Sequence, residues 1–429
     1  MLVTERPEPK GMRKRRGGWK AALPPPLPYR GGFECASILD EIDGELRELA
    51  FQRARDVLLW NAIPAQQRAS LFGPSTHSPT LRLPTLPDEV RKAFRALNRL
   101  VTHPLDASPS RVADACSAIS EWASFNAYPE TAVWYAEIAA LTEPRNPHRA
   151  WVVGRALRQN SQYERSRQWL ERAVGLARRE GNRHVQGGAF LSLGNLEYHL
   201  GNQRAARRWW VDTWRISRKY NLEHAGPARH NLMTLCMLQG RFGEGEEHAA
   251  AAFELYDHAS AGFAGFAHDA GQLWSWQGFF GLAASVFDAV RPHLAPKEQF
   301  IAAANLARAA AGAGDRPGFS AAWDEAERLL NLRNEFAAEG LASVAEGAQF
   351  LGLNSRAIDL AKRAETLARE RRPLQEELPQ TADEGAERAR VAELEVLAHA
   401  RLADRDADVQ TARHELGRGR RLVEPVDAT

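Results

Sequence analysis

The 429-residue chain is poor in cysteine and has almost no excess of either charge. Its three cysteines, Cys35, Cys116 and Cys236, lie far apart and form no CxxC pair. This number and spacing argue against a cysteine-bound zinc ion and against a disulfide framework, and they favour a reducing cytoplasm. The formal net charge is only +2. Any attraction to nucleic acid or to a membrane surface therefore has to come from a local patch.

Long apolar runs and the common catalytic motifs are also missing. No stretch approaches 18 consecutive apolar residues, so no membrane span is expected. There is no GxxxxGK followed by Ser or Thr, no GxGxxG after a strand-like segment, no HExxH and no GxSxG. We therefore predict that the protein is not an enzyme and needs no cofactor.

The first 33 residues have a composition of their own. They are rich in proline, which favours extended conformations, and we expect this arm to be disordered. It either contacts nucleic acid, an acidic partner or a membrane surface, or it is a solubilising tail or an extension in front of Met12. Its basic residues from Pro9 onward are Lys10, Arg13, Lys14, Arg15, Arg16, Lys20 and Arg30, with no acid among them.

Helical segments are predicted on both sides of the middle of the chain. Residues 34–110 read as an N-terminal helical cap, with one amphipathic helix over Ser37–Trp60 and a second after Pro87. Residues 373–429 read as a linker followed by a degenerate helical pair with a polar outer face. Such pairs close the ends of helical arrays.

Residues 111–372 repeat one pattern at intervals of 34 to 40 residues. Every copy but one has a small residue where two helices would cross closely, and Met233 is the exception. Seven residues later comes a position suited to a left-handed turn, which five copies fill with glycine. Twelve residues after each crossing position a second small residue follows, and only Phe319 breaks that rule. The crossing positions are Ser120, Gly154, Gly194, Met233, Gly271, Ala307 and Ala345, and the turn positions are Ala127, Ser161, Gly201, Gly240, Gly278, Gly314 and Gly352.

The pattern resembles the tetratricopeptide repeat (TPR) family. The residues that carry the resemblance are Leu193, Gly194, Tyr198, Gly201, Asn202, Ala206 and Trp210. The resemblance implies an all-α, right-handed α-solenoid of about seven stacked antiparallel helix pairs, and its long repeats are similar to those of bacterial peptide-sensing arrays. Met233 and Phe319 depart from the small residues of the family pattern.

The resemblance also implies where a partner would bind. In this family the first helix of each pair lines a concave groove, and its polar and aromatic side chains face the partner. That groove would suit a protein or peptide with acidic and apolar side chains. The alternative is a solvated inner face, or one filled by the chain's own tail. The predicted groove residues are Trp151, Arg155, Arg158, Asn195, Tyr198, His199, His230, His268, Gln272, Trp276 and Arg308.

Two more specific sites are not predicted. Asn195 matches one asparagine of the family's carboxylate clamp, but Trp151, Leu191 and His230 stand where lysine is needed, so binding of a chaperone tail is not expected. The histidines between His184 and His293 show no spacing typical of metal ligands, and no metal site is predicted.

The sequence thus favours a cytoplasmic, non-enzymatic scaffold that binds a protein or peptide. One alternative is a regulatory sensor in which a peptide changes the pitch of the superhelix. The other is an accessory protein that binds nucleic acid through the basic arm, which the lack of a basic stripe along the array disfavours.

Overall fold

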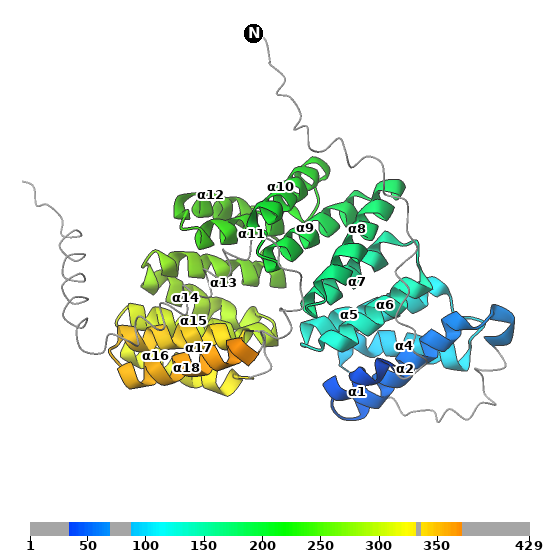
Figure 1. Ribbon diagram of the computed structural model, residues 1–429, viewed down its shortest axis with the longest axis horizontal. Coiled ribbons are helices and arrows are strands. Elements are labelled where there is room, and N and C mark those ends of the chain that lie inside the picture. The colour runs from blue at the N-terminus through cyan, green and yellow to red at the C-terminus, as the bar shows by residue number, and fades with distance from the viewer. Residues whose placement is uncertain (1–33, 69–86, 332–335, 371–429) are drawn as a thin grey trace, which may run out of the picture. The chain divides into compact units, whose positions relative to one another are not determined.

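The structure is a computed structural model that describes residues 34–68, 87–331 and 336–370 (Figure 1). These residues form helices and turns without any β-strand, which confirms the predicted all-α class. No helix among them is both long and apolar enough to cross a lipid bilayer. The chain divides into two compact units, one ending at Gln299 and one beginning at Phe300. The predicted arm (1–33) and C-terminal pair (373–429) lie outside the described residues.

The N-terminal region corrects the expectation of a single helix over Ser37–Trp60. After the short 3-10 helix η2 (Glu34–Ala36) come α1 (Ser37–Glu41) and α2 (Glu45–Ala62). The chain breaks between them because Gly44 has a φ of 70°, which a continuing right-handed helix does not allow. The 3-10 helix η3 (Ala65–Gln67) follows α2, and α4 spans Asp88–Thr102.

These first helices are attached to the first helical pair by specific hydrogen bonds. Both carboxylate oxygens of Glu41 accept backbone N–H groups at the start of α6 (Pro129–Thr142), from Glu130 at 2.8 Å and Thr131 at 2.7 Å. A carboxylate at this end of a helix is favoured by the unpaired N–H groups and by the helix dipole. The buried Tyr135 hydroxyl donates to the carbonyl oxygen of Ala50 at 2.6 Å.

Seven antiparallel helix pairs follow in the described residues, of which the sixth is joined through a shared apolar core. The division between the two units falls within the first helix of that sixth pair. A 3-10 helix, η4 (Arg291–His293), precedes α15. The pairs are α5 (Pro109–Phe125) with α6 (Pro129–Thr142), α7 (Pro147–Gln159) with α8 (Tyr163–Glu180), α9 (Arg183–His199) with α10 (Gln203–Tyr220), α11 (Ala225–Leu238) with α12 (Phe242–Phe253), α13 (Ala261–Trp276) with α14 (Phe280–Val290), α15 (Pro296–Gly312) with α16 (Arg316–Leu329), and α17 (Ala337–Phe350) with α18 (Asn354–Glu370).

The turns within the pairs lie at the predicted positions. All seven predicted turn residues have positive φ, from 56° at Ser161 to 87° at Gly278. Ala127 and Ser161 adopt this conformation in spite of their Cβ atoms, which shows that the geometry of the pair requires it. The repeat register read from the sequence is therefore confirmed.

The close crossings within the pairs are also confirmed. A Cβ built on Gly154 would lie 2.5 Å from the Leu170 side chain, and one on Gly194 would lie 2.4 Å from Trp210. Phe319, which breaks the small-residue rule, can be buried because α17, the first helix of the next pair, leaves space for its ring. There Gly347 has no side chain, and a Cβ at that position would lie 3.2 Å from the Phe319 ring.

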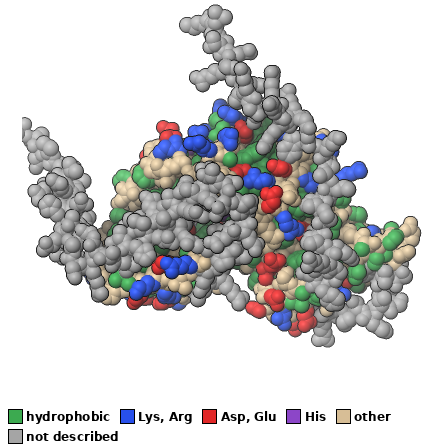
Figure 2. All heavy atoms as spheres, viewed as in Figure 1, with side chains coloured by type: hydrophobic (Ala, Val, Ile, Leu, Met, Phe, Trp, Pro, Cys, Tyr) green, Lys and Arg blue, Asp and Glu red, His purple; other side chains and the backbone are tan. Residues whose placement is uncertain are grey.

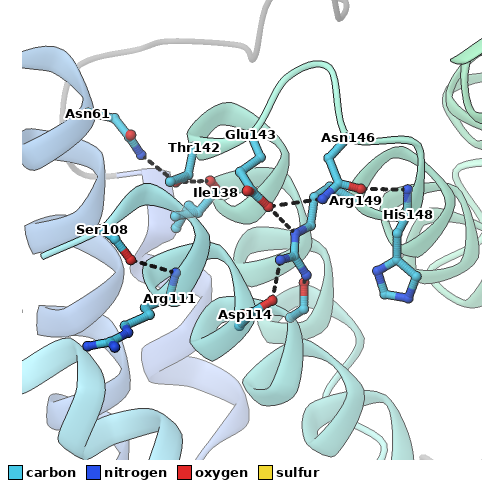
Figure 3. A network of polar contacts seen from close by, with 11 residues as sticks. Asn61, Ser108, Arg111, Asp114, Ile138, Thr142, Glu143, Asn146, His148 and Arg149 are labelled. Atoms are coloured by element: carbon cyan, nitrogen blue, oxygen red, sulfur yellow. Dashed lines mark hydrogen bonds and ion pairs between the residues drawn. The ribbon is translucent and has the colours of Figure 1, made fainter. Parts of the chain in front are cut away.

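Arg149 on α7 joins α7 to the first pair (Figure 3). Its side chain is 6% exposed and forms ion pairs with Asp114 of α5 and, at 2.9 Å, with Glu143 after α6. It also donates to the Ser117 hydroxyl at 3.1 Å. A buried guanidinium needs such partners, because an unpaired buried charge is strongly destabilising.

Candidate partner-binding site

The first helices of the pairs in the first unit form a continuous row. α5 contacts α7, α7 contacts α9, and α11 contacts α13, and a hydrogen bond from Asn231 of α11 to Asn195 of α9 links the two parts of the row. No two second helices in the described part of the chain are in contact to a comparable extent. Helices that lie on the inner side of a stack approach each other more closely than those on the outer side. The row α5, α7, α9, α11 and α13, here called the first-helix row, is therefore the inner side of this unit.

Many of the predicted groove residues contact the equivalent region of the next repeat. We call these contacts the inter-repeat ladder. In the first unit, Arg158 Nη1 donates to His199 Nε2 at 2.8 Å, Asn231 Nδ2 donates to Asn195 Oδ1 at 2.7 Å, and His230 Nε2 donates to Asp269 Oδ2 at 2.8 Å. In the second unit, Arg308 Nε donates to Glu346 Oε2 at 2.7 Å.

The ladder changes how the predicted residues are interpreted. Side chains at matching positions of stacked helices lie within reach of one another, so they pair internally before any partner arrives. Asn195 also accepts a hydrogen bond from Trp210 Nε1 at 2.9 Å, and Tyr198 packs against Trp210 with ring centroids 5.8 Å apart. Asn195 therefore joins its own helical pair to the next one, whereas Tyr198 packs within its own pair, and the sequence alone did not reveal these roles.

Trp151 is a buried residue and not an exposed aromatic anchor. Only 8% of it is exposed, and its indole N–H donates to the Ser192 hydroxyl at 2.9 Å. Its ring packs on Gly188, where a Cβ would lie 2.4 Å away. Arg155 places its guanidinium 5.5 Å from the centre of this ring, remains partly exposed, and forms no ion pair within the described residues.

A polar cluster connects α11, α13 and the segment between α12 and α13. Asp269 accepts hydrogen bonds from His230 at 2.8 Å and from His268 Nδ1 at 3.0 Å, while the Tyr256 hydroxyl lies 3.1 Å from His230 Nδ1. Burial alone would raise the pKa of Asp269, but the two histidine hydrogen bonds outweigh it and hold that pKa well below its usual range. Burial and the nearby Asp269 charge raise the pKa of Tyr256.

Sequence reasoning found His230 and His268 but missed Asp269 and Tyr256. The repeat spacing could have revealed Asp269, because this residue lies 39 positions, or one repeat, after His230. Tyr256 lies in the connection between α12 and α13, where the repeat pattern says nothing about side-chain direction.

The far end of the first-helix row exposes apolar side chains. Trp276, the last residue of α13, is 44% exposed, and Phe279 and Leu282 across the adjoining turn are 54% and 50% exposed. Gln272, one turn before Trp276, is partly exposed. Phe279 and Leu282 were not among the predicted partner-binding residues, because their exposure follows from the packing of α13 on α14.

A second histidine cluster lies at the start of α9 and in the turn before α11. His184 Nε2 donates to Glu223 Oε1 at 3.0 Å, and His224 Nε2 donates to the backbone carbonyl of His184, also at 3.0 Å. Burial and the neighbouring His184 lower the pKa of His224. The hydrogen bond from His184 lowers the pKa of Glu223. The sequence spacing had not suggested that these residues meet.

Charge on the visible face is mixed. Figure 2 shows basic and acidic side chains interspersed over the described helices of that face, with no large area of one sign. This agrees with the net charge of +2.

Comparisons with known proteins reveal similarity at the level of the fold only. No protein-family model and no curated protein matches the chain. Among solved structures, BtubC from P. vanneervenii is 19% identical over 52% of this chain and 91% of its own, with a TM-score of 0.38. A Rap protein complexed with competence and sporulation factor is 13% identical over 80% of this chain and 91% of its own, with a TM-score of 0.39. Cut9 with Hcn1 is 14% identical over 64% and 52%, with a TM-score of 0.43.

These scores are too low to transfer a partner or an activity. The fold itself is clear from this chain, whose helical pairs, left-handed turns and close crossings follow the repeat register. The fold of the described residues is TPR-like.

Proposed function

We propose that the protein is a non-enzymatic scaffold that binds an extended protein or peptide segment along the first-helix row, from α7 to α13. Acidic groups of the partner would pair with Arg155, and an apolar side chain would pack on Trp276. The proposal rests on one difference: Arg155 and Trp276 are not held by partners of the ladder, whereas the residues between them are. Arg155 has no ion pair in the described residues and Trp276 is 44% exposed, whereas the residues between them pair across repeats.

The ladder supports such a role by holding the binding surface in place. A surface that is already ordered loses little conformational entropy when a partner binds. Arg155 is further fixed by its contact with the Trp151 ring, and guanidinium groups bind carboxylates through paired hydrogen bonds. Exposed tryptophan is enriched among the residues that dominate binding energies.

The spacing of the helices sets the minimum length of the partner. Packed helices lie about 8–10 Å apart, so the three steps from α7 to α13 cover roughly 24–30 Å. An extended chain advances about 3.3–3.6 Å per residue, so the segment needs about seven to nine residues.

The test is selection of ligands from a displayed library of random twelve-residue peptides on immobilised protein. Wild type should enrich peptides that carry Asp or Glu at one end and a large apolar residue at the other. The Arg155→Ala/Trp276→Ala variant should bind those peptides at least tenfold more weakly. Arg208→Ala, which removes an exposed arginine from the second helix α10, is the matched control and should bind as wild type does.

Equal binding by wild type and the double variant would reject the first-helix row as the binding surface. Enrichment of peptides without acidic residues would reject the role of Arg155 while leaving the apolar end of the surface in place.

The regulatory sensor is a second candidate, favoured by the position of the ladder between adjacent first helices. A ligand that exchanges hydrogen bonds with His230 or Asn195 would alter the distance between repeats. A sensor predicts that the selected peptide changes the radius of gyration in small-angle scattering, and a rigid scaffold predicts no change. The nucleic-acid alternative depends on residues 1–33 and rests on composition alone.

A further inference from the structure

The cluster of His184, Glu223 and His224 contains three side chains of the kinds that bind transition metals. One ligand atom from each lies within 4.8 Å of the other two. In tetrahedral zinc sites with bonds of about 2.0–2.2 Å, the ligand atoms are roughly 3.3–3.5 Å apart. His184 Nε2 and Glu223 Oε1, at 3.0 Å, are already close to that separation. His184 and Glu223 are both exposed, so side-chain rotation can close the remaining distance.

The ring of His224 already makes the backbone hydrogen bond that is typical of a metal-binding histidine. Its Nε2 lies 3.0 Å from the His184 carbonyl oxygen, which can only accept a hydrogen bond, so this nitrogen carries the proton. The lone pair of the neutral ring is then on Nδ1. Metal-binding histidines nearly always donate their other N–H to a carbonyl or carboxylate, which fixes both tautomer and ring orientation.

The surroundings keep that ring in place. Trp151 contacts His224 edge-on with centroids 5.7 Å apart, and it contacts His184 in the same manner at 6.1 Å. Gly187 permits the close approach of His224, because a Cβ there would lie 3.1 Å from the imidazole Cδ2. Trp151 thus packs against both histidine rings, and Gly187 packs against that of His224.

We propose that His184, Glu223 and His224 bind one Zn²⁺ ion, with water in the fourth position. Two imidazoles and one carboxylate suit Zn²⁺ and its neighbours in the transition series, whereas Mg²⁺ and Ca²⁺ prefer sites made of oxygen alone. On binding, Zn²⁺ would take the Nε2 lone pair of the neutral His184 ring in place of the hydrogen bond to Glu223, and the ring proton would move to Nδ1. His184 and His224 are 40 positions apart, so the ion would link α9 to the turn that precedes α11 in the next repeat.

The site is tested by calorimetric titration of Zn²⁺ into the full-length, tag-free protein after removal of metals by a chelator. We expect saturable binding of one ion per chain and no comparable binding of Mg²⁺. His184→Gln and Glu223→Gln should each weaken Zn²⁺ binding at least tenfold. The control His293→Gln, which changes an exposed histidine outside the cluster, should leave it unchanged.

A second readout separates metal binding from folding. Because the two altered side chains are exposed, the metal-free variants should unfold at the wild-type temperature. Zn²⁺ should raise the unfolding temperature of wild type and His293→Gln, but not of His184→Gln. Absence of saturable binding, or equal affinity in wild type and both cluster variants, would overturn the proposal and assign any bound zinc to scattered surface histidines. Neither result depends on whether a peptide binds to the first-helix row.

Discussion

At the scale of single residues, His248 is a titratable residue whose side chain takes part in the packing between repeats. The guanidinium of Arg229 lies 4.2 Å above the Trp214 ring and donates from Nη1 to His248 Nδ1 at 2.8 Å. That bond needs an unprotonated ring nitrogen. Burial, followed by the Arg229 and Arg207 charges, lowers the pKa of His248 from 6.5 to about 4.

The first prediction concerns this histidine and pH. Between pH 6.5 and about 4 the unfolded chain protonates His248 while the folded chain does not, so stability is lost as the pH falls through this window. His248→Gln keeps an acceptor for Arg229 but does not titrate. From a shift of this size, wild type should lose about 1–3 kcal/mol more than the variant between pH 7 and 4.5, measured by urea unfolding. His293→Gln should follow wild type, and parallel curves for wild type and His248→Gln would contradict the prediction.

At the scale of helices, turn geometry and close crossings define each pair. At the end of α13, Phe279 N–H donates to the Trp274 carbonyl at 2.9 Å, and Gly278 has a φ of 87°. This is the hydrogen bond of a Schellman turn, which needs a residue in the left-handed region. A Cβ on Gly278 would meet nothing within 4 Å, so its backbone conformation alone favours glycine there.

The second prediction contrasts two glycines of the same helical pair. Gly278→Ala should destabilise the protein by about 1–2 kcal/mol, because alanine is strained at positive φ. Gly265→Ala, inside α13 and equally uncrowded, should stabilise it by about 0.5–1 kcal/mol through helix propensity. Urea unfolding of both variants measures the difference. Effects of the same sign would show that Gly278 has another role.

At the scale of the whole molecule, each helical pair of the first unit packs mainly on its neighbours in the chain. Stability in such arrays is close to a sum over repeats and the interfaces between neighbours. In the second unit, Trp323 of α16 is 1% exposed and packs with Phe300, Phe319 and Leu341. The apolar core of this unit is therefore sensitive to a single large truncation.

The third prediction is that damage in one unit stays local. Trp323→Ala should cost about 3–5 kcal/mol, as expected for removing a buried tryptophan. Hydrogen exchange should show faster exchange in α15–α18, with α7–α10 protected as in wild type. Trp276→Ala, the same substitution at a 44% exposed position, should alter exchange little. Uniform loss of protection along the chain would show that the array unfolds as one cooperative unit.

The sequence by itself determined the helical class, the repeat register and the turn positions. These properties depend on local conformation and on periodic small residues, which a single chain displays directly. The sequence wrongly predicted α1 and α2 as one helix, because the apolar periodicity continues across Gly44 whereas the helical backbone conformation does not.

Only the tertiary structure decided what the polar side chains do. Arg158 meets His199, His230 meets Asp269, and His184 meets Glu223 across neighbouring repeats. Such pairings depend on how far one helix is rotated and shifted against the next. The 34-to-40-residue spacing places each helix in order, but it does not set that rotation, so it could not show which predicted groove residues are already paired.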